Sequence, residues 1–160
     1  MGRPEISWAV RLVLTFAALA ALTACAPAPK PVEPPPPDPT TEDWYRQMTG
    51  QLAAMGREAE SMLQHGKFDP AAEIISKGQP LESRLLAVPR PTLEAMEAAS
   101  DLDDLYGRML LRNRHYGWAR DMFQKNAVRW KVWKLQTSET ARRWKAAVDA
   151  VAECDRHLPE

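Results

Sequence analysis

The sequence offers few side chains suited to catalysis or metal binding. His65, His115 and His157 fall on different predicted elements, and neither a His-x-x-x-His nor a Cys-x-x-Cys spacing occurs. The sequence also has no glycine-rich phosphate loop and no nucleophile elbow. We therefore expect no metal ion, no other cofactor and no enzymatic activity, with an envelope enzyme that lacks these motifs as an alternative.

Two further groups of reactive residues have structural interpretations. Asp101, Asp103 and Asp104 are spaced like the start of a calcium loop, but the glycine and the distal glutamate of such a loop are missing. We interpret these aspartates as solvated helix surface. Cys154 lies on an apolar helical stripe with Trp144. This position favours a buried structural thiol over a reactive or intermolecularly bridged one.

Charge is balanced over the chain but unevenly placed along it. With 21 basic and 21 acidic residues the formal net charge is zero, which excludes a generically nucleic-acid-binding composition, and we expect no nucleic-acid partner. Residues 38–104 carry 13 acids and 6 bases, whereas residues 107–145 carry 2 acids and 11 bases. The basic block can pack on the acidic half, within one chain or between copies, or contact an acidic partner.

The basic block is interleaved with aromatic residues. Helical spacing places Ala119, Met122, Phe123, Trp130 and Trp133 on one inward face, so most tryptophans are expected in the core. Arg120 and the basic residues that follow it point elsewhere, towards a solvated or partner-binding face. The expected contact surface consists of Arg112, Arg114, Arg129, Lys131, Lys134, Arg142 and Arg143.

The N-terminus has the pattern of a secretory signal. Arg3 and Arg11 precede an apolar run of 11 residues at positions 12–22. A run of this length is too short to span about 30 Å of hydrocarbon as a helix, and no second apolar run follows. We therefore expect export and no transmembrane helix in the mature chain.

The apolar run ends in Leu22-Thr23-Ala24-Cys25, which resembles the lipobox of bacterial lipoproteins. The resemblance covers the first 25 residues. It implies cleavage after Ala24, a diacylglyceryl group on the Cys25 thiol and an acylated new amino terminus. Two or three acyl chains give stable membrane anchoring where one does not. Because Ala26 rather than Asp follows Cys25, the resemblance implies the periplasmic face of an outer membrane; an ordinary cleavage site beside an incidental cysteine is the alternative.

The remaining chain divides into a linker and one domain. Eight of the 14 prolines fall between Ala26 and Pro39, which is typical of a semi-rigid polyproline II spacer. We therefore predict a signal peptide over 1–24, the lipidated Cys25 with its linker over 25–40, and a helical domain over 41–160.

From residue 41 onward the apolar residues recur at three- and four-residue steps, which predicts an all-α fold. The first helix is expected to be capped by Thr40 and to stop at His65-Gly66, and Gly78 is expected to end the second. Tyr116-Gly117 is expected to be a turn. The later helices are expected over 81–88, 92–114, 118–133 and 138–157. We predict a small helix-hairpin bundle of about five helices.

Residues 66–78 and 114–126 align with each other at an offset of 48 positions. An aromatic residue, an alanine and two large apolar residues recur in register, as in Phe68 and Ala71 against Tyr116 and Ala119. The pattern resembles the turn and second helix of a tetratricopeptide repeat, although the period differs from 34 and the closing proline is missing. The resemblance implies stacked helical hairpins.

Together these features predict a non-enzymatic lipoprotein of the cell envelope that acts as an adaptor or assembly factor. The expected partners are the membrane, through Cys25, and another envelope protein. One alternative is a tether that binds peptidoglycan or another anionic glycan; anionic lipid headgroups suit the same basic surface. The other alternative is the envelope enzyme.

Overall fold

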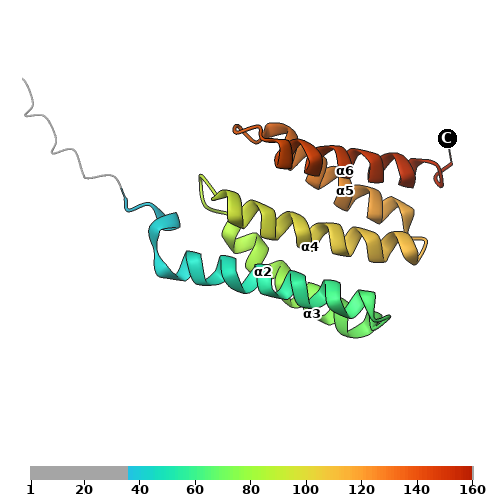
Figure 1. The fold of residues 1–160 in the computed structure, drawn as a ribbon, viewed down its shortest axis with the longest axis horizontal. Coiled ribbons are helices and arrows are strands. Elements are labelled where there is room, and N and C mark those ends of the chain that lie inside the picture. Colours follow the sequence, from blue (N-terminus) through green and yellow to red (C-terminus); the bar gives the residue numbers. More distant parts are fainter. Residues whose placement is uncertain (1–35, 160) are drawn as a thin grey trace, which may run out of the picture. The chain divides into compact units, whose positions relative to one another are not determined.

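A computed structural model describes residues 36–159 of the chain. This part contains five α-helices and no strand, which confirms the predicted all-α helical bundle (Figure 1). The predicted signal peptide, Cys25 and the linker up to residue 35 lie outside the described residues. A short 3-10 turn precedes the helices, and the elements are η2 (Pro39–Thr41), α2 (Asp43–Gln64), α3 (Phe68–Leu86), α4 (Leu93–Arg112), α5 (Tyr116–Val132) and α6 (Ser138–Asp155).

Two of the predicted helix starts differ from those in the structure. Asp38, rather than Thr40, is the capping side chain near the first helix, and it caps η2 by accepting from the Thr40 backbone N–H. The predicted turn at Tyr116-Gly117 is wrong, because α5 begins at Tyr116. Thr92, in contrast, caps α4 by accepting from the Ala95 N–H at 3.3 Å, as its position predicts.

The second helix does not end at Gly78 but continues through Pro80 to Leu86. Gly78 is a packing residue: a Cβ atom added there would lie 2.8 Å from Leu102 Cδ2 of α4. The glycine therefore permits a close approach between α3 and α4. The stabilisation from this packing outweighs the low helix propensity of glycine, which costs about 1 kcal/mol relative to alanine. The prediction of a separate helix over 81–88 is wrong for the same reason.

The two hairpin turns have the same geometry at an offset of 48 residues. Gly66 and Arg114 both adopt positive φ, at 71° and 63°. In the first turn the Lys67 N–H donates to the Met62 carbonyl, and in the second the His115 N–H donates to the Leu110 carbonyl, both at 2.9 Å. Such bonds satisfy the last carbonyls of a helix. The sequence offset thus corresponds to two helix-to-helix turns of the same geometry.

The hairpins α2–α3 and α4–α5 pack side by side, and α6 packs on α5 at the end of the array (Figure 1). The main core lies between α2, α3 and α4 and includes Leu52, Ile75 and Leu102. A smaller core around Phe123 and Cys154 joins α5 and α6 to α4. Cys154 is fully buried and unpaired, as predicted for a structural thiol, and burial raises its pKa.

Within residues 36–159, no helix combines the length and the apolar character that crossing a bilayer requires.

Candidate functional site

The central residue of the predicted basic surface is buried. The Arg129 side chain is only 5% exposed, and its guanidinium lies between two carboxylates. Nη2 donates to Glu82 Oε1 at 3.1 Å and to Asp103 Oδ2 at 2.8 Å. The prediction that Arg129 belongs to an accessible surface is therefore wrong, because its charge is neutralised inside the protein.

Lys125 completes this buried ionic cluster, which we define as Glu82, Asp103, Lys125 and Arg129. Its Nζ donates to Glu82 Oε1 at 2.6 Å and to Asp103 Oδ1 at 2.9 Å. Arg129 Nη1 also donates to Asn126 Oδ1 at 2.5 Å. The cluster joins α3, α4 and α5, so it is a structural device, and the interpretation of Asp103 as solvated helix surface is wrong.

Burial has opposite consequences for the charges in the cluster. Burial, together with the neighbouring Asp103 carboxylate, raises the pKa of Glu82. Burial alone would lower the pKa of Lys125, but the hydrogen bond to Glu82 and the charge of Asp103 raise it on balance. The four ion pairs of the cluster join acidic residues of region 38–104 to basic residues of region 107–145. The acidic and basic regions thus pack on each other within one chain.

The remaining predicted contact residues do not form one surface. Arg112 and Arg114 lie at the α4–α5 turn, where the Arg112 guanidinium is 3.7 Å from the Phe68 ring centroid. Lys131 and Lys134 lie at the other end of α5. Because α5 has 17 residues and a helix rises 1.5 Å per residue, the two pairs are separated by about 25 Å.

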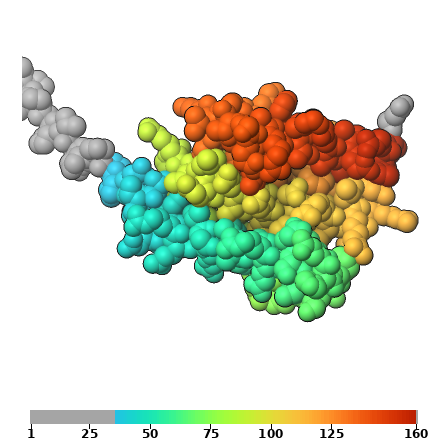
Figure 2. Space-filling model, in the orientation of Figure 1, coloured from blue at the N-terminus to red at the C-terminus, as the bar shows by residue number. Residues whose placement is uncertain are grey.

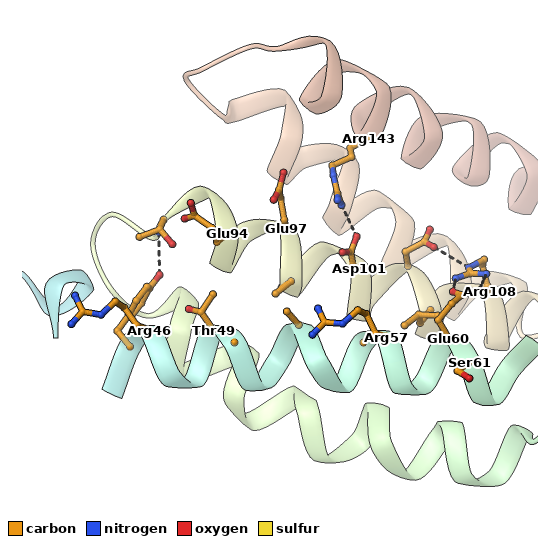
Figure 3. Close-up of a pocket in the computed structure, with 18 of the residues that line it drawn as sticks. Arg46, Thr49, Arg57, Glu60, Ser61, Glu94, Glu97, Asp101, Arg108 and Arg143 are labelled. Atoms are coloured by element: carbon orange, nitrogen blue, oxygen red, sulfur yellow. Dashed lines mark hydrogen bonds and ion pairs between the residues drawn. The ribbon is translucent and has the colours of Figure 1, made fainter. Parts of the chain in front are cut away.

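The two arginines at the start of α6 differ from each other. Arg142 is exposed and pairs with Glu139, with Nη2 donating to Oε1 at 2.7 Å. Arg143 points the other way, towards α4, where Nη1 donates to Asp101 Oδ1 at 2.5 Å (Figure 3). Asp101 is therefore also paired, and of these two arginines only Arg142 points outward.

The predicted core positions of the aromatic residues are confirmed for Trp130 and Phe123, which are almost completely buried. Trp130 Nε1 donates to Ser100 Oγ at 2.8 Å, which satisfies the buried indole. Trp118 and Trp144 are instead 67% and 41% exposed. These two tryptophans are therefore surface residues of α5 and α6.

A groove with a volume of about 1030 Å³ runs along α2 and α4, and we call it the α2–α4 groove. Arg143 of α6 also lines it, opposite the side formed by α2 (Figure 3). In Figure 2 the surface is hollowed where α4 lies between α2 and α6. On α2 the lining extends from Arg46 to Gln64, which corresponds to a length of about 27 Å.

Small residues open the α2 side of the groove. Gly50, Ala53 and Gly56 all line it. A Cβ atom added to Gly50 or Gly56 would meet no heavy atom within 4 Å, although Gly56 is itself buried. Packing therefore does not require either glycine, and each lowers helix stability by about 1 kcal/mol relative to alanine.

The charges of the groove fall into paired and unpaired sets. Arg108 pairs with Glu60 and Asp104, and Arg143 pairs with Asp101. The hydrogen bond from Arg108 lowers the pKa of Glu60. In the half of the groove towards the C-terminal end of α4, each carboxylate therefore has an arginine partner.

Three charged side chains that line the groove have no ion-pair partner within residues 36–159. They are Arg57 on α2 and Glu94 and Glu97 on α4. Thr49 also lines the groove, and its Oγ1 has no hydrogen-bond partner in the same part of the chain. The groove therefore has hydrogen-bonding capacity that the protein does not use itself.

The sequence analysis did not identify this groove, although two signals for it were present. Gly50 and Gly56 lie inside a helix where alanine would be more stable. Glu94, Glu97 and Asp101 recur at three- and four-residue steps, which places them on one face of α4. Neither signal shows which helices enclose that face.

Comparison with known proteins gives no family assignment: no protein-family model, no curated protein and no solved structure matches this chain.

Proposed function

We propose that the protein is a non-enzymatic adaptor of the cell envelope that binds a polypeptide segment of another envelope protein in the α2–α4 groove. The groove replaces the basic face as the proposed contact site. One observation carries the proposal: the groove is open and lined by glycines and unpaired charges, which the protein's own packing does not explain.

The dimensions of the groove favour a polypeptide over a small molecule. Sites for drug-sized ligands measure about 300–1,000 Å³ and enclose most of the ligand. The α2–α4 groove lies at the upper limit of that range, and it extends along almost the whole of α2. A length of about 27 Å suits about eight extended residues at roughly 3.3 Å each or about five helical turns.

Anchoring through Cys25 is part of the same proposal. The lipobox-like sequence Leu22-Thr23-Ala24-Cys25 supports lipidation, and the proline-rich linker would hold the helical domain away from the bilayer. Mass spectrometry of the mature amino terminus tests this part. We expect an acylated, diacylglyceryl-modified Cys25; an unmodified terminus at another residue would contradict it.

Affinity capture from crosslinked cell envelopes tests groove binding. The informative variant is Gly56→Trp, because Gly56 lines the groove and an added Cβ atom there meets no heavy atom within 4 Å, so the indole would occupy groove space. Gly117→Trp is the matched control: Gly117 also has no heavy atom within 4 Å of an added Cβ, but it is exposed and does not line the groove.

We expect wild type and Gly117→Trp to recover the same stoichiometric envelope protein and Gly56→Trp to lose it. Equal recovery by all three proteins would contradict groove binding. In that case, sedimentation with purified sacculi would test the glycan-tether alternative. The predicted basic residues that are exposed are Arg112, Arg114, Lys131, Lys134 and Arg142.

A further inference from the structure

The two halves of the α2–α4 groove differ in electrostatic character. Towards the C-terminal end of α4, Asp101 and Asp104 are paired with Arg143 and Arg108, which also pair with Glu139 and Glu60. Towards the N-terminal end, Glu94 and Glu97 have no cation within 4.0 Å among the described residues. A bound segment therefore meets carboxylates that lack an ion-pair partner at one end only.

No cation of α2 lies within 4.0 Å of either carboxylate, and Arg143 of α6, which attracts Glu97 over a longer distance, donates its hydrogen bonds to Asp101 and Glu139 instead. Arg46 of α2 lies in this half, but its guanidinium donates to Asp43 Oδ1 at 2.5 Å and to the Thr41 carbonyl at 3.1 Å. Arg57 lies about three helical turns further along α2 than Arg46, nearer to Asp101 than to Glu94 in Figure 3. The free positive charge of Arg57 and the free negative charges thus occupy different positions along the groove.

Glu94 and Glu97 also lie where their charge is stable without a partner. Glu94 is in the first turn of α4, and Glu97 follows one turn later. The N-terminal end of a helix carries a partial positive charge that favours carboxylates. Within residues 36–159 the pair therefore has only this modest effect and, for Glu97, the longer-range attraction of Arg143. Neither effect occupies the carboxylate oxygens with a hydrogen bond, which leaves them available to a ligand (Figure 3).

We propose that the segment bound in the α2–α4 groove is cationic at one end and presents lysine or arginine side chains to Glu94 and Glu97. This inference rests on the proposed function. The expected ligand is a stretch of about eight residues if extended, with its basic residues at the end that lies beside the start of α4. At the position of the segment that lies beside Arg57, we expect an acidic or an uncharged residue.

A selection from a random 12-residue peptide library, displayed on phage and applied to the immobilised full chain, tests the inference. Lysine and arginine should be enriched at one end of the selected peptides. For the selected peptides, Glu94→Gln with Glu97→Gln should weaken binding by roughly 2- to 30-fold, the range for two exposed ion pairs.

The matched control is Glu58→Gln with Asp69→Asn. Both control residues are exposed, have no ion-pair partner within residues 36–159 and lie outside the groove lining, and Asp69 is in a first helical turn like Glu94. This control should leave the affinity unchanged. A similar loss in both double variants would indicate a general charge effect and would overturn the inference.

The outcomes separate the inference from the proposed function. Selected peptides that lose binding in Gly56→Trp but show no basic enrichment, or no response to Glu94→Gln with Glu97→Gln, overturn the cationic ligand and leave groove binding intact. A selection that yields no peptide dependent on an open groove contradicts the proposed function itself.

Discussion

The buried ionic cluster and the α2–α4 groove use the same residue types in opposite ways. In the cluster, Arg129 is almost completely buried and hydrogen-bonds to both Glu82 and Asp103. In the groove, Glu94 and Glu97 have no cationic partner in the described part of the chain. Partnership, rather than residue type, thus separates a structural charge from one available for binding.

The glycines of the helices show the same division. Gly107 is needed for packing, because an added Cβ would lie 2.7 Å from Phe123 Cε1. Gly56 meets nothing within 4 Å and opens the groove. Matched substitutions at packed and at open positions therefore test this division. Those at packed positions should destabilise the protein, and those in the groove should not.

The largest expected effect is in the buried ionic cluster. Arg129→Met removes the guanidinium and leaves two buried carboxylates with Lys125 alone, so it should lower the free energy of unfolding by about 3–5 kcal/mol. Urea denaturation monitored by circular dichroism measures this.

The matched control for this substitution is Arg57→Met in the groove, which should change stability by no more than about 0.5 kcal/mol. Equal losses in the two variants would contradict the division into paired and unpaired regions. A triple variant, Arg129→Met with Glu82→Gln and Asp103→Asn, should recover part of the loss because no buried carboxylate remains unpaired and Lys125, which is 45% exposed, can be solvated.

The second prediction compares the two glycine environments. Gly107→Ala should destabilise the protein by about 1 kcal/mol, because overpacking of about 1–3 kcal/mol exceeds the gain in helix propensity. Gly56→Ala should instead stabilise it by about 0.5–1 kcal/mol, since nothing opposes the gain. The same denaturation experiment measures both, and a destabilised Gly56→Ala would show that Gly56 is a packing residue.

The smallest predicted effect concerns pH. The hydrogen bonds and charges of Arg142 and Arg143 lower the pKa of Glu139 to about 2, from 4.5. A carboxylate with a lowered folded-state pKa contributes stability above pH 4.5 and loses it as the pH falls towards 2. Wild type should therefore lose more stability than Glu139→Gln between pH 5 and pH 2.

The size of this difference should stay below about 1 kcal/mol, because the Glu139 carboxylate is exposed and solvent screens its ion pairs. Thermal unfolding at a series of pH values measures how steeply the stability of each protein falls with pH. Identical slopes for wild type and Glu139→Gln would show that these ion pairs do not contribute to stability.

Local periodicity was sufficient to predict the helices, and the 48-residue offset correctly aligned two equivalent turns. The prediction from local sequence failed at Gly78. A glycine that ends a helix and a glycine that leaves space for Leu102 of a neighbouring helix have the same local sequence signal. The contact that distinguishes them joins positions far apart in the sequence.

The candidate site was harder to predict for the same physical reason. Arg129 is polar on a helical wheel, but its partners Glu82 and Asp103 lie 47 and 26 positions earlier in the chain. The groove depends on how α2, α4 and α6 stack, which no single-helix pattern specifies. A count of charges therefore identified the basic block but not which of its residues remain available to a partner.

The most direct test of the account places a photo-crosslinking benzoylphenylalanine at position 50, inside the groove, in living cells. We predict one discrete protein adduct from position 50, its loss when Gly56→Trp is added, and no such adduct from position 117. An adduct that persists in the Gly56→Trp background, or that forms equally from position 117, would contradict binding in the groove.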